Sequence, residues 1–111
     1  MRLRYAAPLA LLALGVMIRL GGGLSAAETK EVQIDNYSFT PGTLTVPVGT
    51  TVTWTNHDET PHTVVSADTP RSFKSSGLDT DDKFSVTFTK PGSYSYLCTV
   101  HPYMTGKIVV K

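Results

Sequence analysis

The chain has 111 residues, which is enough for one domain. Ten basic and nine acidic side chains give a net charge of +1, and the basic residues are dispersed along the sequence. This balance excludes the basic surface of a nucleic-acid-binding protein, and it leaves no polybasic patch that would bind a lipid surface.

The first 27 residues have the three parts of a secretory signal peptide. Residues 1–4 are basic, residues 6–18 are apolar, and small residues at 25–27 precede Glu28. The apolar run is shorter than the roughly 20 residues that span a bilayer, so an uncleaved anchor is the weaker alternative. We expect a Sec-type signal peptide at 1–27, export to the periplasm, and one domain at 28–111 without stable membrane association. Its net charge would be −2, because three arginines leave with the signal.

Beyond residue 28 the hydrophobic period is two, which is typical of half-buried strands. Proline and glycine residues at 41–42, 47–49 and 91–92 mark turns between these segments. The pattern predicts an all-β fold, an antiparallel sandwich or barrel, with no helix after the signal. The alternating positions are Val32/Ile34, Val52/Trp54, Phe84/Val86/Phe88, Tyr94/Tyr96/Cys98 and Ile108/Val110.

Residues 66–82 are polar and the least regular part of the domain. We interpret them as an ordered surface crossover, with Phe73 and Leu78 packing back onto the core. Trp54, the only tryptophan, is expected to anchor that core rather than to contact a partner.

The single cysteine of the chain, Cys98, lies in a spacing typical of a metal site. It cannot form an internal disulfide, and a free exported thiol is open to oxidation. His101 follows three residues later and Met104 three after that, with His62 well upstream. Two imidazoles, a thiolate and a thioether match a trigonal copper site with a weak axial methionine, and the thioether argues against zinc.

His57 is the competing first ligand. It lies in a turn-like segment beside Asp58 and Glu59, whereas His62 follows Pro61 and opens a β-branched run. Because a ligand gains from a fixed backbone, we favour His62 and interpret His57 as a solvated turn residue.

From about residue 44 to residue 111 the chain resembles the cupredoxins, and among them the plastocyanin and amicyanin group, with most similarity to amicyanin. The resemblance is carried by residues 52–56, 61–62, 84–88, 92–98 and 106–109, together with the short Cys-x₂-His-x₂-Met loop. It implies a Greek-key β-sandwich that binds one type 1 copper. His62, Cys98 and His101 would be the equatorial ligands and Met104 the axial ligand.

The resemblance also implies a function. The protein would be a monomeric one-electron carrier, not an enzyme, between redox proteins such as a periplasmic dehydrogenase, a cytochrome or an oxidase. The ring edge of His101 would serve as the electron port at the surface. Pro102 and Tyr103 would form an apolar contact patch, although Tyr103 fits ordinary core packing equally well.

Two residues depart from the amicyanin pattern. Thr63 replaces an asparagine whose side chain ties the two ligand segments together, a role that the threonine hydroxyl could take over. Val100 replaces a proline, so it supplies a backbone N–H that we expect to point at the Cys98 sulfur.

Two other functions compete with the electron carrier. A copper protein for delivery or resistance usually exposes several methionine or histidine residues, and only Met104 is available here. An enzyme with Cys98 as nucleophile and His101 as base needs an orienting third group, and the spacing on a tight loop gives poor attack geometry.

Overall fold

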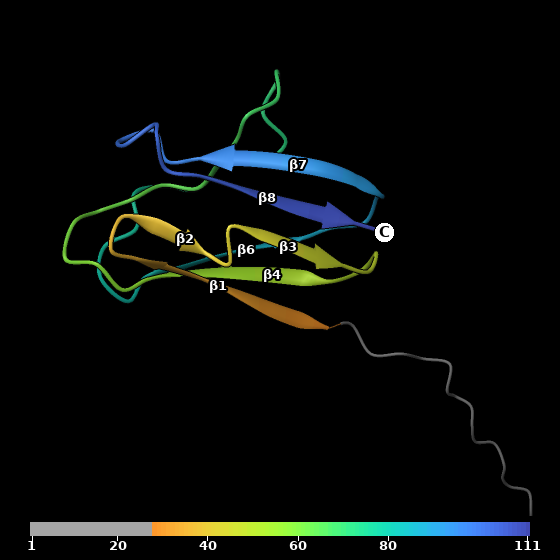
Figure 1. The fold of residues 1–111 in the computed structure, drawn as a ribbon, viewed down its shortest axis with the longest axis horizontal. Coiled ribbons are helices and arrows are strands. Elements are labelled where there is room, and N and C mark those ends of the chain that lie inside the picture. The colour runs from red at the N-terminus through yellow and green to blue at the C-terminus, as the bar shows by residue number, and fades with distance from the viewer. Residues whose placement is uncertain (1–27) are drawn as a thin grey trace, which may run out of the picture.

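The computed structural model describes residues 28–111, so the expected signal peptide at 1–27 lies outside the described residues. Eight strands form two four-stranded sheets that pack face to face (Figure 1). The described part of the chain contains no helix that could cross a membrane. The strands are β1 (Thr29–Asp35), β2 (Ser38–Thr40), β3 (Thr43–Val46), β4 (Thr51–Asn56), β5 (Val65–Ser66), β6 (Lys83–Thr87), β7 (Gly92–Leu97) and β8 (Thr105–Val110).

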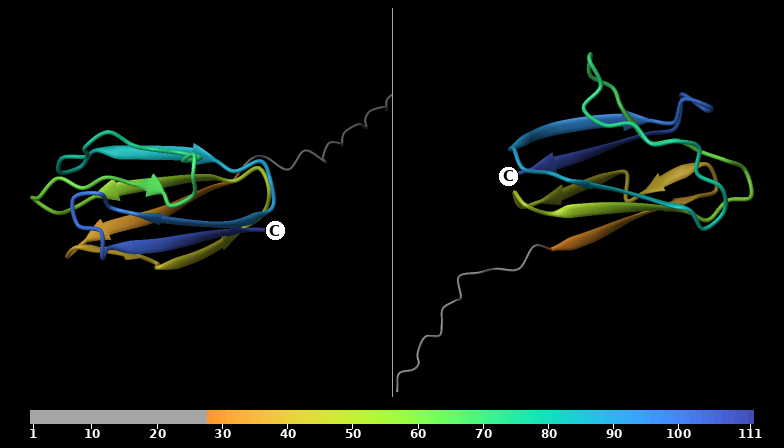
Figure 2. Two further views of the ribbon diagram at one scale, coloured as in Figure 1. Left: turned by 90° about the horizontal axis from the view of Figure 1, so that it is seen from above. Right: turned by 180° about the vertical axis from the view of Figure 1, so that it is seen from behind.

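Both sheets are mixed, which corrects the expected purely antiparallel pairing. The first sheet has the order β2-β1-β4-β6 and the second the order β3-β8-β7-β5. β1 pairs with β4, and β3 with β8, in parallel, while the other neighbours are antiparallel. Alternating hydrophobicity shows which face of a strand is buried but not which strand lies beside it. The sandwich itself, predicted from the resemblance, is confirmed (Figure 2).

The core lies between the two sheets and uses the inward positions that the alternation predicts. Trp54 is fully buried and meets the Tyr96 ring edge-on, with ring centroids 5.3 Å apart. Aliphatic side chains buried in the same core, such as Val52 and Ile108, each contribute about 1.5–3 kcal/mol of hydrophobic stabilisation. Leu78 is buried and Phe73 packs against the same cluster, so the crossover closes over the core as expected.

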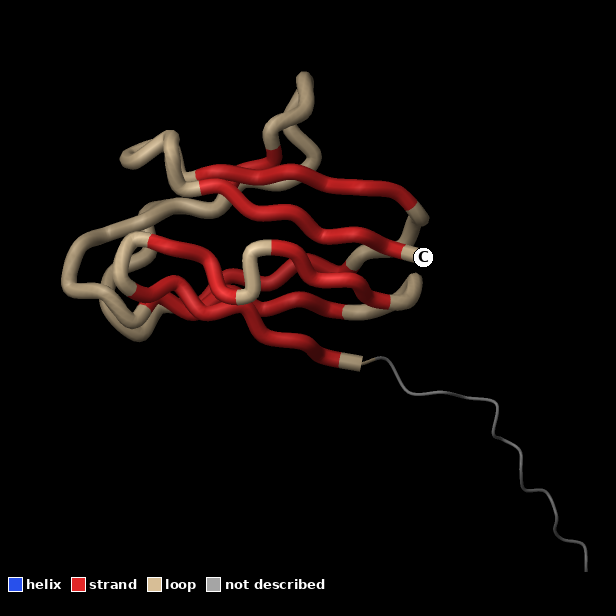
Figure 3. The backbone as a smooth tube through the Cα atoms, viewed as in Figure 1, coloured by secondary structure: helices blue, strands red, loops and turns tan. Residues whose placement is uncertain are grey.

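Three loops meet at the end of the sandwich away from the C-terminus. Figure 1 shows the loop after β7, the segment after β4 and the turn between β1 and β2 at this end, and Figure 3 shows that the strands lead into them. The β1–β2 turn contains Asn36 and Tyr37, with φ of 53° and 58°. Two successive left-handed residues are the geometry of a tight hairpin, and a tyrosine is an uncommon residue there.

Candidate metal centre

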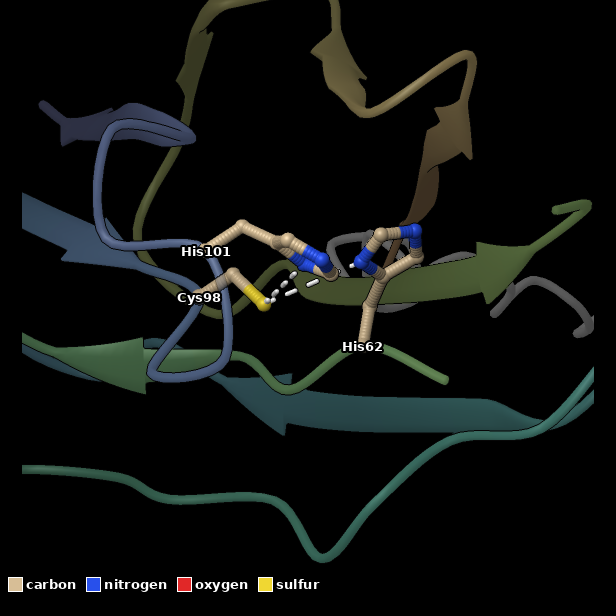
Figure 4. A group of neighbouring side chains, drawn as sticks. All are labelled: His62, Cys98 and His101. Atoms are coloured by element: carbon tan, nitrogen blue, oxygen red, sulfur yellow. Dashed lines mark hydrogen bonds between the residues drawn. The ribbon is translucent and has the colours of Figure 1, made fainter. Parts of the chain in front are cut away.

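His62, Cys98 and His101 form one cluster at the loop-bearing end of the sandwich (Figure 4). The Nδ1 atoms of both histidines lie 3.8 Å from Cys98 Sγ, and all three donor atoms lie within 4.8 Å of one another. His62 and Cys98 are fully buried, whereas His101 is half-buried. The structure therefore brings together three of the four residues expected to bind metal, although they are up to 39 positions apart in the sequence.

The backbone of His62 is fixed by the crossover. His62 and Leu78 exchange two backbone hydrogen bonds, of 3.1 Å and 2.7 Å, as an isolated β-bridge. The buried Leu78 side chain anchors this bridge to the core. The position of His62 is thus set by rigid elements rather than by a free loop.

Met104, the fourth expected ligand, closes the short loop that begins at Cys98. The Cys98 amide donates to the Met104 carbonyl at 3.1 Å, and the Met104 amide donates to the His101 carbonyl at 2.8 Å. The Met104 side chain is only 3% exposed. Three of the expected ligands therefore share one loop that its own backbone hydrogen bonds hold closed.

The environment of Cys98 favours the thiolate. Burial acts to raise the pKa of this thiol, but the surrounding polar groups outweigh burial and lower the pKa to about 6. These groups are the Thr63 amide, which donates to the sulfur at 3.4 Å, the rings of His62 and His101, and the His101 amide. Since the thiolate is the form that binds metal, the site is prepared for a metal ion near neutral pH.

The Thr63 side chain links the two segments that carry the expected ligands, as the sequence suggested. Its hydroxyl oxygen accepts the Thr99 amide at 2.8 Å and lies 2.8 Å from the Thr99 hydroxyl. Val100, in contrast, does not act as expected. In the described part of the chain the amides that reach the sulfur are those of Thr63 and His101, and Val100 is 56% exposed.

Two further residues, Asp58 and Tyr37, lie at the site and were not predicted from the sequence. Asp58 accepts a hydrogen bond from His62 Nε2 at 2.8 Å. The Tyr37 ring meets the rings of both His62 and His101 edge-on, at centroid distances of 5.2 Å and 5.0 Å. The only sequence signal was the acidic pair beside His57, which we interpreted as part of a turn. His57 itself is exposed, hydrogen-bonded to Gln33 and outside the donor cluster, as expected.

The donor set fits a trigonal metal ion. Bonds of about 2.0 Å to nitrogen and about 2.3 Å to sulfur, about 120° apart, separate two donors by about 3.7 Å. Cys98 Sγ lies 3.8 Å from both histidine nitrogens, close to this spacing. Soft sulfur and imidazole donors with a methionine nearby favour copper.

A two-sheet sandwich with two histidines, a cysteine and a methionine at one end defines the blue copper class of electron-transfer protein, whose cofactor is one type 1 copper ion. The chain belongs to the cupredoxin family, since the model of the cupredoxin-like domain matches residues 8–110.

Individual relatives agree with this family. Amicyanin-alpha from Methylorubrum extorquens is 36% identical over 88 residues, which cover 77% of this chain and 74% of that protein. A Cu(I) structure of an amicyanin variant has a TM-score of 0.71 and 34% identity, covering 80% of this chain and 88% of that one.

A copper-containing nitrite reductase from Thermus scotoductus is also similar, with a TM-score of 0.72 and 35% identity. The match covers 85% of this chain but only 25% of the reductase. The likeness thus concerns one part of that enzyme and carries no enzymatic activity over to this chain.

Proposed function

We propose that the protein is a periplasmic one-electron carrier that shuttles between Cu(I) and Cu(II). His62, Cys98 and His101 would hold the copper, and Met104 would be the fourth and weakest ligand. The observation that carries this proposal is the 3.8 Å spacing of the cysteine sulfur from both histidine nitrogens. A copper ion held in this way would supply a redox centre that accepts and releases one electron.

The residues around the site support fast electron transfer because they resist rearrangement. The Leu78 bridge holds His62, and the Thr63 amide and hydroxyl hold the cysteine segment. Burial of His62, Cys98 and Met104 excludes water from the donors. A donor set that moves little between oxidation states keeps the reorganisation small.

His101 is the proposed electron port, because it is half-buried while the other donors are enclosed. Tyr103 lies beside it, with ring centroids 6.2 Å apart, and is 74% exposed. Core packing of Tyr103, the alternative left open by the sequence, is therefore wrong. Tyr37 and Val100 are also exposed, at 40% and 56%. This apolar surface suits brief docking of a redox protein such as a dehydrogenase, a cytochrome or an oxidase.

The two competing functions lose support. Copper delivery needs ligands that exchange with a partner, whereas His62, Cys98 and Met104 are at most 3% exposed. A nucleophilic Cys98 would need access to a substrate, but its side chain is fully buried between two imidazoles. Neither function accounts for a rigid, enclosed donor set.

The mature protein is expected to bind one copper per chain and to be intensely blue when oxidised. Copper content and visible absorption measure both properties. Cys98→Ser should abolish the colour, because the absorption arises from the thiolate bonded to copper. His57→Ala is the matched control and should leave colour and copper content unchanged, since His57 lies outside the donor cluster.

Three outcomes would contradict the proposal: a chain that binds zinc and not copper, colour that survives Cys98→Ser, or colour that His57→Ala removes. The last outcome would indicate that His57, and not His62, is the first ligand.

A further inference from the structure

We propose that Asp58 is a positioning residue that orients His62 and lowers the reduction potential of the copper through its negative charge. The inference rests on the proposed function, in which His62 binds copper through Nδ1. Asp58 is not one of the clustered donors, and it acts through the far side of the His62 ring (Figure 4 shows that ring beside Cys98 and His101).

The contact between the two side chains fixes the tautomer of His62. Asp58 Oδ2 lies 2.8 Å from His62 Nε2, where the side chain of Asp58 is 11% exposed and that of His62 fully buried. A carboxylate only accepts hydrogen bonds, so Nε2 carries the proton. Nδ1 then carries no proton, and its lone pair is available to a metal ion. This nitrogen faces the Cys98 sulfur.

The carboxylate is itself held from a second direction by the β1–β2 turn. Its Oδ1 accepts the Asn36 amide at 2.7 Å, and its Oδ2 accepts the Tyr37 amide at 2.9 Å. These are the two residues of the β1–β2 turn that have positive φ, and the carboxylate satisfies both of their amides. One side chain thus connects the turn that carries Tyr37 to the first copper ligand.

The backbone of Asp58 is equally constrained. Its amide donates to Asn56 Oδ1 at 2.9 Å, and its carbonyl accepts from the Thr80 hydroxyl at 2.7 Å. Because both ends of the residue are held, the carboxylate keeps its place when the charge of the copper changes. Such a fixed partner orients a ligand histidine and makes it more basic.

Three N–H groups, from Tyr37, His62 and Asn36, point at the two carboxyl oxygens of Asp58. This is the arrangement of a negatively charged carboxylate, which only accepts hydrogen bonds. A negative charge coupled to the ligand favours Cu(II), the more positive state. The potential should therefore be lower than it would be with a neutral side chain at this position.

The test is a redox titration of the blue absorption in the copper-loaded protein. Asp58→Asn keeps the shape and a hydrogen-bond acceptor but removes the charge, and it should raise the equilibrium constant for reduction about tenfold, which is about 59 mV for one electron. Glu59→Gln is the matched control. It removes the same charge from an exposed neighbour and should change the constant less than twofold.

Asp58→Glu adds a second arm, because it restores the charge and should return the constant to within about twofold of the original. An unchanged or lowered potential in a blue Asp58→Asn protein would overturn the proposal, as would an equal shift in Glu59→Gln.

A measurement on the unmodified Cu(I) protein covers the case in which Asp58→Asn does not fold. The His62 Nε2 proton should give a slowly exchanging imidazole resonance in the NMR spectrum, because it is buried and donated to Asp58. Absence of this resonance would overturn the proposal. Failure of the unmodified chain to bind copper would instead contradict the proposed function, so the two failures are distinguishable.

Discussion

At the scale of single residues, Thr63 connects the two ligand segments through both its backbone and its side chain. Its amide donates to the Cys98 sulfur at 3.4 Å, and its hydroxyl accepts the Thr99 amide at 2.8 Å. The first contact is made by the backbone and needs no particular side chain. The second needs a short side chain that can accept a hydrogen bond, and the threonine hydroxyl supplies it.

We expect Thr63→Val to lower the free energy of unfolding of the copper-free protein by about 1–2 kcal/mol. Valine has nearly the same shape but loses the contacts to the Thr99 amide and hydroxyl, each worth about 1 kcal/mol. Thr63→Ser keeps the hydroxyl and should lose less than half as much. Urea denaturation measures both variants, and equal losses would show that the hydroxyl does not tie the segments together.

At the scale of elements, the pairing of β7 with β8 depends on a glycine. Tyr96 and Gly106 lie directly opposite each other. A Cβ at Gly106 would stand 2.4 Å from the Cζ and Oη atoms of the Tyr96 ring. The tyrosine is fully buried and cannot swing away, so glycine leaves the space that its ring occupies. This pairing lies beside the ligand loop and helps to hold the loop's two ends together.

Gly106→Ala is therefore expected to destabilise the copper-free protein by about 1–3 kcal/mol, the usual cost of overpacking a core. Gly77→Ala is the matched control, because no atom lies within 4 Å of the Cβ it would introduce. The control should be neutral or stabilising by up to about 1 kcal/mol. Denaturation midpoints compare the two, and a Gly106→Ala protein as stable as the control would contradict the packing argument.

At the scale of the whole molecule, the donor cluster joins loops that belong to different sheets. His62 follows β4 of the first sheet, whereas Cys98 and His101 lie between β7 and β8 of the second. The described domain is small, and its only cysteine is free. A small domain has a thin margin of stability. A metal held by both loops adds a link between the sheets at this end.

Copper removal should lower the melting temperature by about 10 °C or more while the far-ultraviolet spectrum of the sheets stays the same. A ligand at 100 times its dissociation constant raises the free energy of unfolding by about 2.7 kcal/mol. For a domain of this size, about 1 kcal/mol shifts the melting temperature by about 4–8 °C. Circular dichroism with and without copper makes the comparison. Cys98→Ser should show no such dependence, and equal melting temperatures in the unmodified protein would contradict the link.

The sequence by itself determined the features that depend on local order. Alternation at Val52/Trp54 and Ile108/Val110 predicted strands and their buried faces, because neighbouring side chains on a strand point to opposite sides. The spacing of Cys98, His101 and Met104 predicted candidate metal donors on one short loop, because residues so close in sequence need no distant partner to meet. His62 was preferred to His57 from its flanking residues, and the structure places only His62 in the cluster.

Only the tertiary structure decided which distant groups meet. The parallel pairs, β1 with β4 and β3 with β8, join strands that are not consecutive in the chain, which alternation cannot specify. Asp58 reaches the turn at Asn36 and Tyr37 across more than 20 residues, and Thr63 reaches Cys98 across 35. These contacts depend on how the loops of two packed sheets come together at one end, and no local pattern records that arrangement.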